Sequence, residues 1–192
     1  MMRKAVLVTI TLIAALVLAA CSAPELSDYE LNFELGESHT LGYEVDDSGK
    51  ITIEERIMTF RNAPGAKPMT ITGYEVSYYD GNGTEISTKS TADQQPFSRA
   101  IFVPAGLTCD APDPEGGCSI LDAGARVGPS PLVQAPHAGN LLPVEIAEMH
   151  LMMSMTNPTA AVKWSAEFVF HGYRDRGEFV TRPYRVHIVA PN

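Results

Sequence analysis

Alternation of apolar and polar residues near the C-terminus restricts this chain to a β-rich fold. Between residues 162 and 170 every second side chain is apolar: Val162, Trp164, Ala166, Phe168 and Phe170. The residues between them include Lys163, Ser165 and Glu167. Because successive side chains of a strand point to opposite faces, this pattern predicts a strand with the apolar set in the core and these three polar side chains in water.

The next segment predicts the partner strand of a hairpin. Residues 174–177 (Arg-Asp-Arg-Gly) are typical of a turn, and residues 179–189 alternate again. We expect Tyr184, Val186 and Ile188 to face the core, with Arg185 and His187 outside. Pro183 cannot donate a backbone hydrogen bond, so it predicts an edge or a bulge in this strand.

Two earlier segments have the same character. Residues 51–60 are rich in β-branched side chains and precede a turn at 61–65. In residues 69–79, a strand would place four side chains on one face: Thr72, Tyr74, Val76 and Tyr78. Asp80–Gly83 predicts a tight turn into a return strand at 84–87. Hairpins of this spacing predict an all-β fold, a single antiparallel β-sandwich.

Three runs resemble parts of immunoglobulin-like or fibronectin-III-like domains of bacterial lipoproteins. Residues 58–62 and 71–83 are similar to their central strands, and residues 168–177 to their final hairpin. The resemblance implies an immunoglobulin-like sandwich, although this chain lacks the inter-sheet disulfide of true immunoglobulin domains.

The middle of the chain breaks this pattern. Residues 104–143 are rich in Pro, Gly and Ala and predict a long insertion in the domain. Residues 144–156 fit either a strand, with Met149, Leu151, Met153 and Met155 on one face, or a helix. We favour the strand because the neighbouring segments are strands.

The N-terminus has the composition of an export signal. Arg3 and Lys4 precede an apolar run, residues 5–20, which predicts a signal peptide over residues 1–20. Its end, Leu18-Ala19-Ala20-Cys21, resembles the lipobox of bacterial lipoproteins at every position. The resemblance implies cleavage before Cys21 and acylation of that residue. We therefore expect a tether over residues 21–30 and a folded domain over residues 31–192.

The resemblance also predicts a location. Ser22 follows the lipidated cysteine, and in this family a residue other than Asp at that position does not retain the protein at an inner membrane. We expect a lipid-anchored protein of the cell envelope that faces the periplasm or the exterior. In a cell with two membranes, the outer one is the expected site.

The other two cysteines fit an exported protein. Cys109 and Cys118 are separated by eight residues that include two prolines and two glycines. A cysteine pair in an oxidising compartment predicts a disulfide. The spacing matches neither a zinc site nor a C-x-x-C redox pair.

Candidate chemistry lies in three places. His150 and Met152 belong to the Met/His cluster 149–155, whose thioether and imidazole groups suit Cu(I), although core packing is the simpler interpretation. Acidic side chains between the cysteines offer oxygen ligands for Ca²⁺, with solvated charges as the alternative. Near the C-terminus, two histidines on neighbouring strands and three arginines predict a basic patch for an acidic partner or a polysaccharide, although the solvated face of a hairpin is the simpler interpretation. These residues are His171, His187, Arg174, Arg182 and Arg185.

Charge and motifs limit the function. The chain has 192 residues, 45% of them hydrophobic, and a net charge of −9, which argues against a nucleic-acid partner. It contains no common catalytic motif and implies no cofactor. We therefore expect a membrane-anchored lipoprotein that is a non-enzymatic binding or envelope-structural module, with an envelope protein or a polysaccharide as its partner. The alternatives are a copper-binding accessory protein and an envelope enzyme of unrecognised type.

Overall fold

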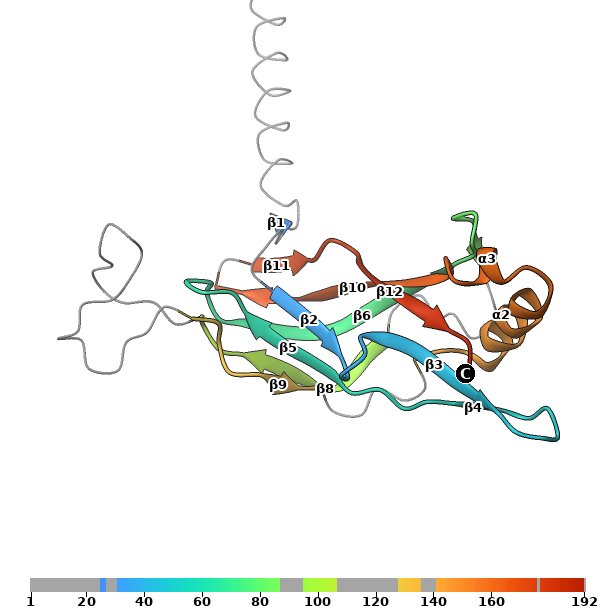
Figure 1. Ribbon diagram of the computed structural model, residues 1–192. Coiled ribbons are helices and arrows are strands. Elements are labelled where there is room, and N and C mark those ends of the chain that lie inside the picture. Colours follow the sequence, from blue (N-terminus) through green and yellow to red (C-terminus); the bar gives the residue numbers. More distant parts are fainter. Residues whose placement is uncertain are drawn as a thin grey trace, which may run out of the picture.

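The computed structural model describes residues 25–26, 31–86, 95–106, 128–135, 141–175 and 177–191. These residues form two β-sheets and two helices (Figure 1). The larger sheet contains β1 (Glu25–Leu26), β3 (Thr40–Val45), β4 (Ile51–Ile53), β6 (Met69–Tyr79), β7 (Glu85–Ile86), β8 (Gln95–Val103), β10 (Ser165–Arg174), β11 (Gly177–Val180) and β12 (Tyr184–Val189). The smaller sheet contains β2 (Leu31–Leu35), β5 (Met58–Asn62) and β9 (Val133–Gln134). The helices are α2 (Val144–Thr156) and α3 (Pro158–Ala161).

Strand β10 is the centre of the larger sheet. It pairs antiparallel with β6 on one side and with β11 and then β12 on the other. Strand β6 continues the sheet to β7 and β8. Among the described strands, β1 pairs with β11 and β3 with β12 in parallel. The prediction of a β-rich fold is confirmed, but the sheet is mixed and not purely antiparallel.

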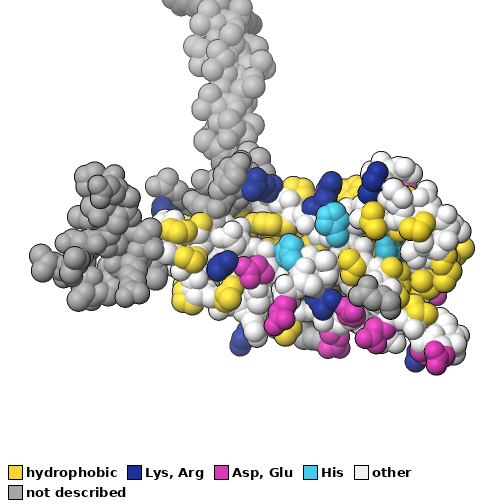
Figure 2. Space-filling model, in the orientation of Figure 1, with side chains coloured by type: hydrophobic (Ala, Val, Ile, Leu, Met, Phe, Trp, Pro, Cys, Tyr) yellow, Lys and Arg dark blue, Asp and Glu magenta, His cyan; other side chains and the backbone are white. Residues whose placement is uncertain are grey.

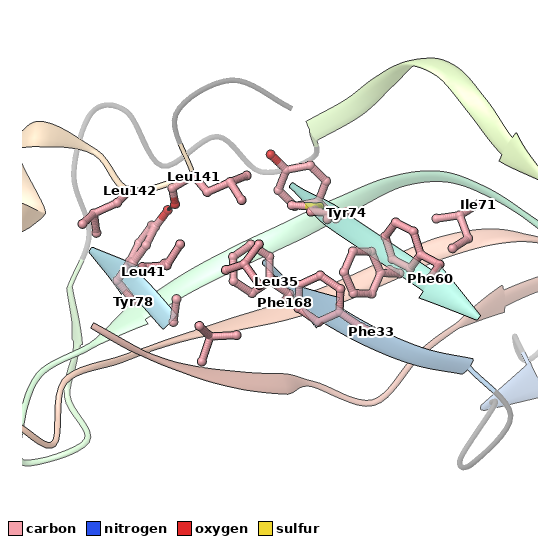
Figure 3. Packing of buried hydrophobic residues seen from close by; sticks show 14 of the residues in the cluster. Phe33, Leu35, Leu41, Phe60, Ile71, Tyr74, Tyr78, Leu141, Leu142 and Phe168 are labelled. Atoms are coloured by element: carbon pink, nitrogen blue, oxygen red, sulfur yellow. Dashed lines mark hydrogen bonds between the residues drawn. The ribbon is translucent and has the colours of Figure 1, made fainter. Parts of the chain in front are cut away.

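The two sheets enclose an aromatic core. Phe33 of β2 and Phe60 of β5 project from the smaller sheet toward Phe168 of β10 (Figure 3). Both rings also contact Phe170 of β10. The ring centroids of Phe33 and Phe170 lie 4.9 Å apart, and those of Phe60 and Phe170 5.0 Å apart. All four rings are buried, so the apolar face of β10 packs against the smaller sheet.

The alternation near the C-terminus is mostly confirmed. Trp164, Ala166, Phe168 and Phe170 are buried, and so are Val186 and Ile188 of β12, whereas Arg185 and His187 are exposed. Val162 was expected in the core but is 69% exposed, because β10 begins only at Ser165 and Val162 follows α3. Ser165, expected in water, is buried.

Interruptions of the strands explain three other differences. The run 51–60 is two strands, β4 and β5, in different sheets. In β6 the pairing register shifts around Thr72, so Ile71 is buried before the shift, and Tyr74 and Tyr78 after it. Pro183 lies between β11 and β12, where the chain leaves the ladder with β10.

Residues 144–156 form a helix, so the strand prediction is wrong. Met, Leu, Ala and Glu, which dominate the segment, are strong helix formers. Pro143 precedes the helix, and Asn157 and Pro158 end it and begin α3. None of the described helices is both long enough and apolar enough to span a bilayer.

The predicted insertion is partly described. Within it, β9 pairs with β5 and extends the smaller sheet, and Leu141 and Leu142 pack in the core. Residues 107–127 and 136–140 lie outside the described residues. So do the signal peptide, Cys21, Cys109, Cys118 and the acidic side chains between the last two.

Candidate binding surface

The larger sheet has an outer face that the smaller sheet does not cover. In β10, Phe168 and Phe170 point to the core, so the alternate residues Glu167, His171 and Tyr173 point outward. Two recesses lie at opposite ends of this strand. We call them the aromatic recess and the basic recess.

The aromatic recess lies at the end of β10 that turns into β11. Thr70 of β6 pairs with Phe102 of β8 on one side and Tyr173 of β10 on the other. Phe102 is 60% exposed and Tyr173 52% exposed. With Pro68, Met69, Arg174 and Asp175 these residues line a recess of about 230 Å³.

A glycine brings the strands of this recess together. A Cβ at Gly172 would lie 2.1 Å from the carbonyl oxygen of Thr70 and also against the ring of Phe179. Only glycine permits that approach, next to the register shift in β6. The lack of a side chain at Gly172 therefore helps to set Tyr173 beside Thr70.

The basic recess lies where β10 begins. It measures about 370 Å³ and is lined by four residues of the hairpin, by Val162 and Lys163 after α3, and by Ser165, Arg185 and His187. The four hairpin residues are Tyr79, Asp80, Gly81 and Gly83. A Cβ at Gly81 would lie 2.3 Å from the carbonyl oxygen of Ala160, so glycine lets the hairpin approach α3.

The charges of the basic recess are partly compensated. Arg185 forms an ion pair with Glu167. Backbone hydrogen bonds, first that from Thr84, lower the pKa of Asp80, which keeps this exposed carboxylate charged. On the face shown in Figure 2, Lys and Arg side chains gather along the edge formed by β11, β12 and α3. The lining of this recess therefore combines the cations Lys163 and Arg185 with the carboxylate of Asp80.

The five residues of the predicted basic patch do not form one patch. Arg185 and His187 line the basic recess, whereas Arg174 lines the aromatic recess and His171 lies between the two ends. His187 pairs across the strands with Ser165, and His171 with Val180, so the two histidines are not neighbours. Nε2 of His171 instead lies 3.2 Å from Oε1 of Glu75. Arg182 is exposed between β11 and β12.

His150 and Met152 also lie apart. His150 is 1% exposed, whereas Met152 is 69% exposed on the other side of α2. The structure therefore does not bring these two predicted copper ligands together, because residues two apart on a helix point in nearly opposite directions.

Both ring nitrogens of His150 have protein partners. Nε2 donates to the carbonyl oxygen of Ala161 at 3.1 Å, and Nδ1 accepts from the hydroxyl of Tyr43 at 3.0 Å. Burial lowers the pKa of His150 and raises that of Tyr43 to about 12. His150 is thus a neutral, hydrogen-bonded histidine of the core.

Helix α2 presents a further exposed surface. Met149, Met152 and Met155 are all exposed, and Figure 2 shows hydrophobic side chains over this helix. Among the described residues, no group of three or more His, Cys, Asp or Glu side chains could hold a metal ion.

Sequence reasoning missed Phe102 and Tyr173. Tyr173 occupies an outward position in the alternation of β10, which is the one local signal for an exposed aromatic side chain. Phe102 has no such signal, since its position beside Thr70 depends on strand pairing. The sequence matches no protein-family model and no curated protein.

Proposed function

We propose that this chain is a bacterial lipoprotein, a lipid-anchored and non-enzymatic binding module of the cell envelope with an immunoglobulin-like β-sandwich. One observation carries the proposal: the lipobox Leu18-Ala19-Ala20-Cys21 at the end of an apolar segment that follows Arg3 and Lys4. Acyl chains on Cys21 would supply the attachment, since each buried methylene contributes about 0.8 kcal/mol.

The domain supports a binding role through its exposed side chains. Phe102 and Tyr173 are large aromatic residues on the outer face of the larger sheet, and aromatic residues are enriched where proteins bind partners. The basic recess adds a separate place for an anionic group of an envelope protein or a polysaccharide. The outer face thus offers two chemically different contacts.

Metabolic labelling with a palmitate analogue tests the anchor. In a bacterial host, the wild-type chain should incorporate the label and float with membranes, and Cys21→Ala should do neither. The double variant Cys109→Ala, Cys118→Ala is the matched control, because it removes the two cysteines outside the lipobox together and leaves no unpaired partner; it should keep both properties. Labelling that persists in Cys21→Ala, or a mature chain that still begins at Met1, would refute the proposal.

We also propose a disulfide between Cys109 and Cys118, because an exported chain with one further cysteine pair meets an oxidising space. Mass spectrometry after alkylation tests it. The two thiols should react only after reduction, and alkylation without reduction would refute the bond.

A further inference from the structure

The first described strand limits how far the domain can move from a lipid anchor. Glu25 and Leu26 of β1 pair with Phe179 and Val180 of β11. Cys21 precedes Glu25 by four residues, which span at most about 14 Å when fully extended. This step rests on the proposed function, because it takes Cys21 as the lipidated residue. The β1 edge of the domain is then held close to the bilayer.

The aromatic recess lies at the same end of these strands, from β10 in the middle of the sheet to β8 at the edge opposite β1. At this end the strands follow the order β1, β11, β10, β6 and β8 (Figure 1). Neighbouring strands are about 4.8 Å apart, so Tyr173 on β10 lies about 10 Å from β1, and Phe102 on β8 about 19 Å. The register agrees, since Glu25 pairs with Phe179, which pairs with Gly172 next to Tyr173.

The composition of the recess suits the bilayer interface. Aromatic side chains with a polar end, such as Tyr173, are enriched at the level of the lipid headgroups, and Phe102 offers an apolar ring. Arg174 and Asp175 carry opposite charges at the rim. A contact of this kind depends on apolar insertion, so it tolerates the net negative charge of the chain better than a purely electrostatic contact would.

We propose that the aromatic recess lies against the phospholipid headgroup layer of the membrane that holds the anchor. Phe102 and Tyr173 then insert at the interface, and the lipid on Cys21 keeps them at high local concentration there. Helix α2 and the basic recess lie at the other end of β10, about 30 Å along the strand from Tyr173. A weak contact thus orients the binding surfaces of the domain.

Fluorescence quenching tests the proposal with the full lipidated chain. The protein is reconstituted into phosphatidylcholine vesicles that contain lipids brominated near the headgroup end of the acyl chain. The test variants are Phe102→Trp and Tyr173→Trp. The matched controls are Leu132→Trp, at an exposed position beside β9 of the smaller sheet, and Met152→Trp on α2. Trp164 is buried and gives every variant the same background.

We expect bromolipid to reduce the fluorescence of the two test variants and to leave the controls unchanged. The loss should persist at high salt, because insertion of apolar rings is not screened. Equal quenching of all four variants, or none at positions 102 and 173, overturns the proposal. Two further outcomes without quenching also overturn the proposal. Tryptophan emission that changes with protein concentration assigns the recess to a second copy of the chain, and emission that changes with added polysaccharide assigns it to a glycan.

The flotation of the same samples separates this inference from the function on which it rests. A chain that does not float has no working anchor, which contradicts the proposed function. A chain that floats but shows no quenching at positions 102 and 173 contradicts only the membrane contact of the aromatic recess.

Discussion

Two packed regions of the molecule are built from different interactions. Between the sheets, Phe33, Phe60, Phe168 and Phe170 meet through carbon atoms alone. Between α2 and the larger sheet, His150 lies against Tyr43 and Trp164, with ring centroids 5.8 and 5.4 Å away. There the histidine ring also makes two hydrogen bonds, to Tyr43 and Ala161.

The two regions therefore have different roles in the fold. The aromatic core buries four phenylalanine rings, and its stability does not depend on protonation. Helix α2 buries Ile146, Ala147 and His150 but leaves three methionines exposed, so its contact is smaller and more polar. The hydrogen bonds of His150 therefore fix where the helix lies, whereas the phenylalanines hold the two sheets together.

The largest expected effect is in the aromatic core. Phe170→Ala should lower the free energy of unfolding by about 3–5 kcal/mol, because the lost ring leaves a cavity between the sheets. Urea denaturation measures it. Phe102→Ala, which removes an exposed ring, should change stability by less than about 0.5 kcal/mol. A similar decrease in the free energy of unfolding for both variants would contradict a dominant contribution of the aromatic core to stability.

The contact of α2 should be the next most sensitive. His150→Ala should cost about 2–3 kcal/mol, because it leaves a cavity and removes the partners of Tyr43 and the Ala161 carbonyl. His187→Ala, at an exposed position on β12, is the control and should be nearly neutral. If His150→Ala were also neutral in urea denaturation, the two regions would not differ in the way described above.

The same two regions differ in how far the sequence predicts them. Phe168 and Phe170 could be assigned to the core because one face of β10 is buried and the other is not, which produces alternation. Helix α2 is apolar on more than one side, so Met149, Leu151, Met153 and Met155 also fit a strand. The contact of His150 with Tyr43, 107 residues away, leaves no local pattern.

The aromatic recess, too, is only partly predictable from the sequence. The outward position of Tyr173 follows from the alternation of β10. Its proximity to Phe102, however, arises because β10 and β8 both pair with β6. The register shift at Thr72 changes which side chains of β6 face the core, and no residue pattern marks it. The sequence therefore predicts strands and core faces better than it predicts surfaces assembled from several strands.

A smaller effect should appear as a pH dependence. Because burial lowers the pKa of His150 from an ordinary value of 6.5, the unfolded chain binds its proton first. The contribution of neutral His150 to stability is present above that ordinary value and is lost as pH falls below it. His150→Gln, which keeps an uncharged hydrogen-bonding group, should flatten this dependence in urea denaturation between about pH 7.5 and about pH 5.5. An unchanged slope would assign the pH dependence to other groups.

The smallest effect is expected on the outer side of α2. Met152→Gln should change the free energy of unfolding by less than about 0.5 kcal/mol, because the side chain is exposed and glutamine is an equally good helix former. Urea denaturation at two protein concentrations provides the measurement. A loss above about 1 kcal/mol that grows with protein concentration would mean that a second copy covers these methionines. In that case α2 would be held from both sides, and its polar contact with Tyr43 would no longer be what positions it.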